Sequence, residues 1–223
     1  MDLILILVIL AIPAIAQLRI TTTYNRFKKV TNEKGITGQE VARKILDKNG
    51  LENIYVVEVP GNLSDHYDPS RKVVRLSREV FNGESVAAMS IAAHECGHAI
   101  QDKQGYFFMR VRSAIVPIVR VGTALSYVII LIGIIAQVLN IIYVGIALTA
   151  LGLLFQLITL PVEFDASKRG KEELKSLKLV SVLEESDVKE VLSAAAMTYV
   201  AGVLASALQI LRLIMIFGGS RRN

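Results

Sequence analysis

Residues 92–100 read AAHECGHAI and contain the pattern HExxH. On an α-helix, side chains four positions apart lie on the same face, so His94 and His98 can direct one ring nitrogen each at a single metal ion. Imidazole nitrogens at this spacing are typical ligands of a catalytic Zn²⁺. Glu95 follows the first histidine and can take a proton from a water molecule at the metal. The stretch therefore predicts a zinc-binding helix with Glu95 as general base.

The residues around the pattern favour one continuous helix. From Glu84 to Asp102 there is no proline, and the only glycine is Gly97. Asn82 or Ser85 can cap the start, and Gly105 stands where helices often end in a left-handed residue. The alternative is a solvated helix whose two histidines are spaced by four by chance.

Composition points to a membrane protein with one ordinary domain. The 223 residues are 52% hydrophobic and carry a formal net charge of +5, and the mean hydropathy is +0.48. The basic residues flank apolar runs instead of forming a stripe with aromatic residues, so nucleic acid is not expected as a partner. The single cysteine, Cys96, excludes an intrachain disulfide.

Three uncharged runs predict helices that cross a lipid bilayer. Residues 3–18 lack a positively charged n-region and a clear cleavage site, so we expect a retained anchor at 1–19 instead of a signal peptide. Residues 121–162 would form a helix of about 63 Å, twice the bilayer core, and therefore predict a transmembrane hairpin at 113–162 that turns near 137–140. Basic residues on both sides of the hairpin place its two ends in the cytoplasm.

The third run is compatible with two topologies. Residues 191–211 are uncharged, but a full span would leave Arg212, Arg221 and Arg222 outside the cell. The segment 191–223 is therefore a transmembrane or a re-entrant helix, and we expect a span.

The polar segment 20–112 predicts a compact cytoplasmic domain of the α+β class. Residues 37–40 have the form of a capping box that begins a helix, and 54–59 and 72–76 read as strands separated by a polar loop at 61–70. A catalytic helix beside a small sheet, whose edge strand can hold an extended peptide, is a zincin-like arrangement. The expected fold is this domain combined with a helical transmembrane bundle.

A catalytic zinc needs a third protein ligand, and Glu163 is the expected one. It follows the hairpin directly, so the chain can return it to the HExxH helix. Asp102 is a rival on the same helical face as His94, but it lies about 12 Å away along the axis. Asp165 is a further candidate, although on a helix it points away from Glu163.

The pattern HECGH, the two-span insertion and the segment EFDAS at 163–167 together resemble the bacterial membrane-bound neutral zinc metallopeptidases of the YugP-like family. The stretches SDHYDPSRKVVRLS and SIAAHECGHAIQ resemble that family too, and the layout is more distantly similar to the HtpX-type membrane proteases. The resemblance implies His94, His98 and Glu163 as zinc ligands and Glu95 as base. HtpX-type enzymes carry an aspartate four residues after the third ligand, where this chain has Ser167, so the hydrogen bond expected from that aspartate is in doubt.

His66 is the one histidine outside the pattern. It is either a loop residue satisfied by Asp65 or Asp68, or a catalytic group that stabilises the oxyanion of the tetrahedral intermediate.

These observations predict a multi-pass protein of the plasma membrane that binds one Zn²⁺ per chain and hydrolyses polypeptides, which include membrane or misfolded proteins, on its cytoplasmic side. The expected layout is the anchor, the catalytic domain, the hairpin, a third-ligand helix and linker at 163–190, and the C-terminal helix. The alternative is a catalytically silent membrane scaffold that zinc stabilises. A transporter is disfavoured because Arg120 and Arg212 are nearly the only charges within the spans. The sequence does not decide between zinc and another divalent ion.

Overall fold

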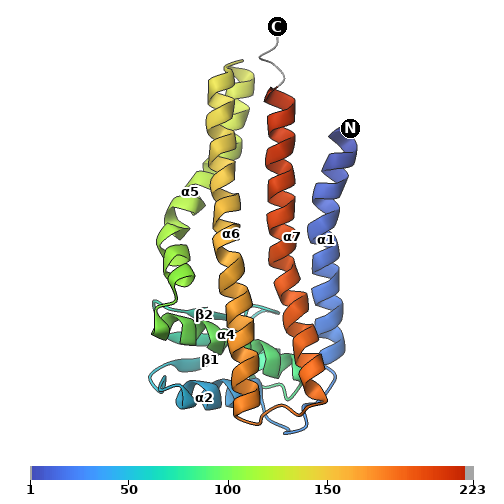
Figure 1. The fold of residues 1–223 in the computed structure, drawn as a ribbon, viewed down its shortest axis with the longest axis vertical. Helices are drawn as coiled ribbons and strands as arrows, with labels where there is room; N and C mark the ends of the chain where they lie inside the picture. Colours follow the sequence, from blue (N-terminus) through green and yellow to red (C-terminus); the bar gives the residue numbers. More distant parts are fainter. Residues whose placement is uncertain (1, 219–223) are drawn as a thin grey trace. The chain divides into compact units, whose positions relative to one another are not determined.

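The computed structural model describes residues 2–218, which are mostly helical and contain one small mixed sheet (Figure 1). Within these residues the chain divides into two compact units. The apolar unit consists of residues 2–17, 110–160 and 198–218, and the mixed unit consists of residues 18–109 and 161–197. In chain order the elements are α1 (Asp2–Phe27), α2 (Gly38–Lys48), β1 (Tyr55–Val59), β2 (His66–Asp68), β3 (Val73–Ser77), α3 (Arg78–Phe81), α4 (Val86–Gln104), α5 (Phe107–Ile135), α6 (Leu139–Ser176) and α7 (Glu184–Gly218).

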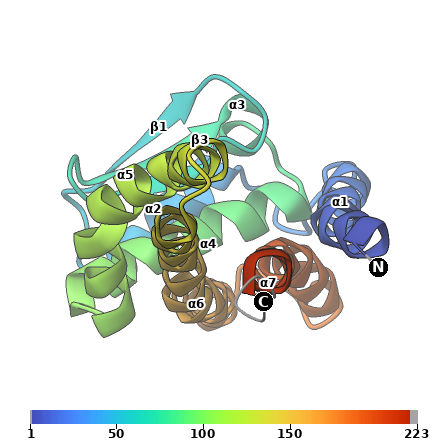
Figure 2. The ribbon, with the colours of Figure 1, turned by 90° about the horizontal axis from the view of Figure 1, so that it is seen from above.

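Helix α2 begins with the predicted capping box. The Thr37 hydroxyl accepts a hydrogen bond from the Glu40 backbone N–H at 3.2 Å, and the Glu40 carboxylate accepts one from the Thr37 N–H at 2.7 Å. Val41, Ile45 and Leu46 form the buried face of the helix. This face joins the core that also contains side chains of β3 and α4, and Figure 2 shows these elements from above.

The sheet has the strand order β1-β3-β2, with β1 parallel to β3 and β2 antiparallel to it. The two predicted strands are confirmed within one residue as β1 and β3. Strand β2 lies in the stretch that we expected to be a loop. It has only three residues, of which Tyr67 alone is buried, so its extended conformation depends on pairing with β3 and leaves no pattern in its own sequence.

Helix α4 carries the HExxH pattern and has the predicted ends. The Ser85 hydroxyl accepts a hydrogen bond from the Ala88 N–H at 3.1 Å, and Gly105 closes the helix with φ of 63°. Fourteen of its nineteen residues are buried, so α4 is a core helix and not a solvated one.

Among residues 2–218, four helices are long and apolar enough to cross a membrane, namely α1, α5, α6 and α7. The hairpin between α5 and α6 turns at residues 136–138, where Gln137 has φ of 56°, as the uncharged run predicts. Helix α6 then continues without a break through Glu163 to Ser176. The expected linker up to residue 190 is a short turn between two long helices, and Arg221 and Arg222 lie outside the described residues.

Candidate metal centre

Helices α4 and α6 cross at very close range in the mixed unit. A Cβ on Gly97 of α4 would lie 2.3 Å from the Ala166 carbonyl oxygen, and a Cβ on Gly170 of α6 would lie 2.6 Å from the Ala93 carbonyl oxygen. Each helix therefore presents a glycine to the backbone of the other. This reciprocal pair of glycines brings the side chains on either side of the crossing within reach of one another.

Three of the predicted metal ligands gather at this crossing. Glu163 Oε2 lies 3.3 Å from His94 Nε2 and 3.5 Å from His98 Nε2. The three candidate ligand atoms lie within 4.8 Å of one another, and Glu163 is only 2% exposed. The structure thus brings together two residues of α4 and one residue that follows them by more than sixty positions.

The donor set fits a zinc ion. Ligands about 2.0–2.1 Å from a tetrahedral ion are about 3.3 Å from one another, which agrees with the two measured nitrogen–oxygen separations. Two imidazole nitrogens and one carboxylate oxygen that converge with their lone pairs repel one another unless a cation lies between them. Two histidines and one glutamate are a known ligand set of catalytic zinc, which keeps a fourth position for water.

Hydrogen bonds on the far side of each imidazole orient the two Nε2 atoms. His94 Nδ1 lies 3.0 Å from Ser167 Oγ, and His98 Nδ1 lies 3.0 Å from Gln101 Oε1. The Gln101 amide nitrogen donates to the Val162 carbonyl and to Asp165 Oδ2, both at 2.8 Å. Since these two groups only accept, the amide orientation is fixed and its oxygen faces His98. His98 Nδ1 is then the donor, and the Nε2 lone pair is left for a metal.

Glu95 is buried next to the three candidate ligands. Burial raises the pKa of its carboxyl to about 7; the nearby His94 opposes this rise, and Glu163 and Asp65 add to it. A hydrogen bond from the Tyr67 backbone N–H also lowers the pKa of Glu95 and indicates that β2 lies beside it. A carboxyl group that titrates near neutral pH can both accept and release a proton.

The two rival candidates for the third ligand, Asp102 and Asp165, form other interactions. Asp102 accepts hydrogen bonds from the Tyr67 hydroxyl at 2.7 Å and from Lys72 Nζ at 2.5 Å. Asp165 accepts from Gln101 and forms an ion pair with Arg169. Both carboxylates hold elements of the mixed unit together, so neither is placed among the metal-ligand atoms.

His66 is exposed at the start of β2, with its Nδ1 2.8 Å from the Ser64 carbonyl oxygen. Because a carbonyl only accepts, His66 Nδ1 is the donor and its Nε2 is left as an acceptor when the ring is neutral. The partner is thus Ser64 instead of Asp65 or Asp68. Its catalytic role stays a prediction.

Sequence reasoning missed Gln101 and Gly170. Gln101 lies three residues after His98, a spacing that places both on one helical face and could have indicated the contact. Gly170 has no signal of its own. However, Ala93 and Gly97 on one helix and Ala166 and Gly170 on the other form small-xxx-small pairs, which are typical of close helix crossings.

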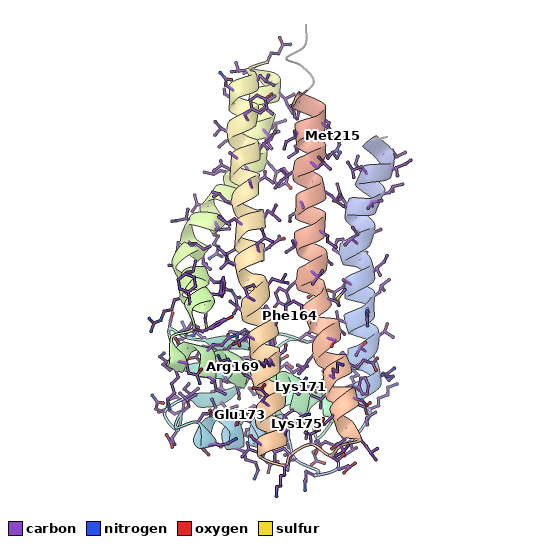
Figure 3. All side chains as sticks on the ribbon, viewed as in Figure 1. Phe164, Arg169, Lys171, Glu173, Lys175 and Met215 are labelled. Atoms are coloured by element: carbon purple, nitrogen blue, oxygen red, sulfur yellow. The ribbon has the colours of Figure 1, made fainter. Side chains whose placement is uncertain are left out.

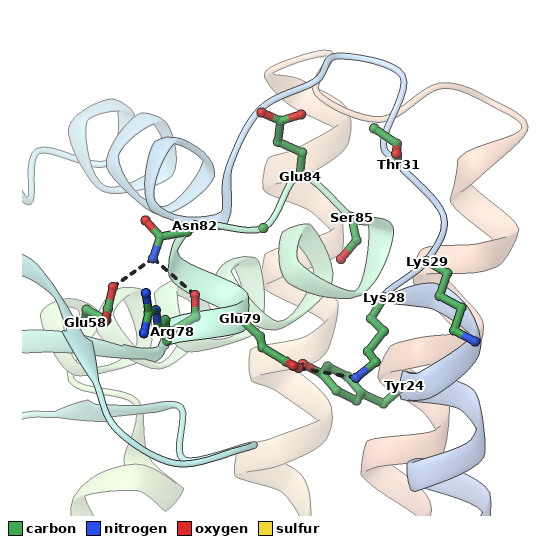
Figure 4. Close-up of a pocket in the computed structure, with 11 residues that line it drawn as sticks. Tyr24, Lys28, Lys29, Thr31, Glu58, Arg78, Glu79, Asn82, Glu84 and Ser85 are labelled. Carbon is green, nitrogen blue, oxygen red and sulfur yellow. Dashed lines mark hydrogen bonds and ion pairs between the residues drawn. The ribbon is translucent and has the colours of Figure 1, made fainter.

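A cavity of about 850 Å³ lies elsewhere in the mixed unit, between the end of α1 and the residues around α3 (Figure 4). Its wall carries charges of both signs, and one ion pair joins two of them. Glu79 accepts a hydrogen bond from the Tyr24 hydroxyl at 2.8 Å and pairs with Lys28 at 3.6 Å, and Glu58 accepts from Asn82 at 2.7 Å. None of the candidate metal ligands lines it.

Comparison with known proteins adds independent observations. The sequence profile of one family, described as "Putative neutral zinc metallopeptidase", matches residues 2–218. The chain is 45% identical over 206 residues to a protein of Bacillus subtilis (strain 168) that is described as "Putative membrane protease YugP", and the alignment covers 92% of each chain. No solved structure matches the chain.

Proposed function

Because this chain belongs to the neutral zinc metallopeptidase family, we propose that it is a membrane-integral zinc-dependent endopeptidase. His94, His98 and Glu163 hold one zinc ion per chain. The observation that carries the proposal is the convergence of three ligand atoms within 4.8 Å of one another beside a buried Glu95. The catalytic part is a zincin-like domain of the gluzincin type, with two histidines from one helix and a glutamate from another.

The chain's own residues supply the proton transfers. A bound zinc ion polarises the scissile carbonyl and lowers the pKa of water. Glu95 accepts a proton from the attacking water on its carboxylate and delivers it to the leaving amine. Ser167 and Gln101 hold the two imidazoles with Nε2 toward the ion. His66 is retained as a candidate contact to the oxyanion.

The polypeptide substrate adds to the edge of the sheet. Strand β2 is at the edge of the order β1-β3-β2, and its Tyr67 N–H reaches Glu95. An extended peptide that pairs with an edge strand is held by backbone hydrogen bonds, which places a scissile bond without demanding a particular sequence. Unfolded segments of membrane or misfolded proteins meet this requirement.

The test is hydrolysis of an unfolded polypeptide by the purified full chain in detergent. We expect casein cleavage that chelation abolishes and zinc restores, and loss of cleavage in Glu95→Gln with zinc content unchanged. Glu52→Gln removes an exposed carboxylate and serves as the matched control. A wild-type chain that binds zinc but cleaves nothing would instead favour the silent scaffold.

We further propose that the mixed unit faces the cytoplasm and that α1, α5, α6 and α7 span the plasma membrane. The proposal depends on the basic residues that flank the hairpin and on the apolar character of the four helices. Reporter fusions at residue 50 and at residue 137 should give opposite sides of the membrane.

A further inference from the structure

A groove of about 310 Å³ lies between α6 and α7 in the mixed unit, and we call it the α6–α7 groove. Its lining combines two kinds of side chain. Lys168, Lys171 and Lys189 contribute positive charge, and Phe164, Leu192 and Met197 contribute apolar surface. Within the described part of the chain, no carboxylate lines the groove.

The chemical character of the groove changes along the helix axes. Lys175 of α6 forms an ion pair with Glu185 of α7, which fixes the register of the two antiparallel helices. One turn further along, Lys171 is level with Lys189, and Phe164 follows about 10 Å beyond Lys171. Figure 3 shows Phe164, Lys171 and Lys175 in this order along α6. The groove is therefore basic at one end and apolar at the other.

The two lysines at the basic end are not neutralised by neighbouring acids. Glu172 pairs with Lys168 at 3.9 Å, and Glu185 and Glu190 pair with Lys175 and Arg26. Among residues 2–218, no carboxylate lies within 4.0 Å of Lys171 or Lys189. Two like charges that line one groove repel each other, and an anion between them removes this repulsion.

The apolar end belongs to the lipid-facing segments of the sequence. Phe164 is 47% exposed and Met197 is 41% exposed. Phe164 lies two residues after the uncharged run that ends at Val162, and Met197 lies within the uncharged run of α7. A ligand that matches both ends carries an anionic group and, about 10 Å away, a hydrocarbon chain.

We propose that the α6–α7 groove binds one anionic phospholipid of the surrounding bilayer. Its phosphate lies between Lys171 and Lys189, and the upper part of an acyl chain lies on Phe164 and Met197. A phospholipid is favoured over a free anion because free phosphate leaves the apolar end exposed.

Ser167 connects this groove to the metal centre. Its hydroxyl lines the groove and is 3.0 Å from His94 Nδ1. When His94 donates to Ser167 Oγ, the hydroxyl hydrogen is left to donate to an anion in the groove. An anion there makes Ser167 a better acceptor, and His94 in turn becomes a more basic ligand. This coupling rests on the proposed function, and it predicts that anionic lipid tightens zinc binding.

Lipid binding is tested first on the metal-free full chain, so that its outcome does not depend on hydrolysis. Native mass spectrometry in detergent should show phosphatidylglycerol retained about tenfold more than phosphatidylcholine. The double variant Lys171→Gln/Lys189→Gln should lose this selectivity, and Lys34→Gln/Lys44→Gln, which removes the same charge from exposed positions outside the groove, should keep it. Selectivity retained without Lys171 and Lys189, or phosphatidylglycerol displaced by inorganic phosphate at equal concentration, would overturn the proposal.

The coupling is tested by zinc affinity in nanodiscs of either lipid. We expect zinc to bind about three- to tenfold more tightly in phosphatidylglycerol, and Ser167→Ala to abolish this difference while lipid retention is unchanged. Equal affinity of the wild-type chain in both lipids would overturn the coupling. Lipid selectivity without any peptidase activity would count against the proposed function alone.

Discussion

The two units of this chain differ in how far they bury their apolar side chains. The mixed unit encloses its own core, in which Ile45, Leu76 and Met89 are fully buried. In the apolar unit, large side chains such as Ile118 and Ile135 are 64% and 75% exposed. Such surface is stable only when another apolar phase covers it. The difference indicates that one unit has an apolar surface suited to a lipid environment, while packing within the chain fixes the geometry of the other.

The candidate metal centre lies wholly in the self-enclosed unit. His94 and His98 belong to α4, and Glu163 belongs to the part of α6 that is counted in the mixed unit. The apolar hairpin separates them in sequence only. Substitutions at the crossing of α4 and α6 should therefore change metal binding, and matched substitutions in the apolar unit should not.

The largest expected effect is the loss of the third ligand. Glu163→Gln should lower zinc affinity by more than about 100-fold, because it replaces a charged ligand with a neutral amide that binds zinc poorly. Titration of the purified protein against a competing chelator measures this. Glu172→Gln, which removes an exposed carboxylate from the same helix, is the control. Equal affinity in the two variants would exclude Glu163 as a ligand.

Gly97→Ala compares the two units directly. Because the new Cβ meets the Ala166 backbone at 2.3 Å, α4 and α6 must separate, and the free energy of unfolding should fall by about 1–3 kcal/mol. The control is Gly202→Ala in α7, where a Cβ meets nothing closer than 3.6 Å. There the better helix propensity of alanine should stabilise the protein slightly. Thermal unfolding in detergent measures both variants, and similar midpoints would show that the crossing is not tight.

Gln101→Leu should weaken zinc binding by about 10- to 100-fold, since His98 loses the acceptor that fixes its tautomer. The exposed Gln39→Leu is the control for the change in polarity. Chelator competition again gives the affinities. An unchanged affinity in Gln101→Leu would mean that the amide has no part in orienting His98.

The last effect concerns pH and the metal-free protein. Burial raises the pKa of Glu95 from 4.5 to about 7, so between these pH values the folded state holds a proton that the unfolded state has released. The contribution of Glu95 to the free energy of unfolding is therefore fully present below pH 4.5. It falls as the pH rises toward 7, by at most about 3 kcal/mol. The thermal midpoint of the chelated wild type, minus that of Glu95→Gln, should decrease between pH 5 and 8. Parallel curves would contradict a raised pKa.

Local patterns allowed much of this structure to be predicted. The HExxH helix with its ends at Ser85 and Gly105 and the hairpin turn near Gln137 depend on neighbours within a few residues, and all are found. The position of Glu163 beside His94 and His98 could be anticipated because two helices joined by a turn bring the chain back toward its starting point. Strand β2 was missed because its pairing with β3 defines it.

The hydrogen bonds that orient the two imidazoles could not be predicted. The serine at position 167, where HtpX-type enzymes carry an aspartate, left a hydrogen bond to His94 in doubt, yet the Ser167 hydroxyl lies 3.0 Å from the ring. The Gln101 network joins α4 to the backbone at Val162. Both depend on how closely two helices approach, and single-sequence patterns do not contain that distance.

A glutamate side chain is short, and a carboxylate on one helix meets imidazoles on another only if the two axes lie unusually near. The Cβ atoms that Gly97 and Gly170 lack make that approach possible. The position of a bound ion therefore depends on the absence of two side chains, at Gly97 and Gly170, as much as on the three side chains that would bind the ion.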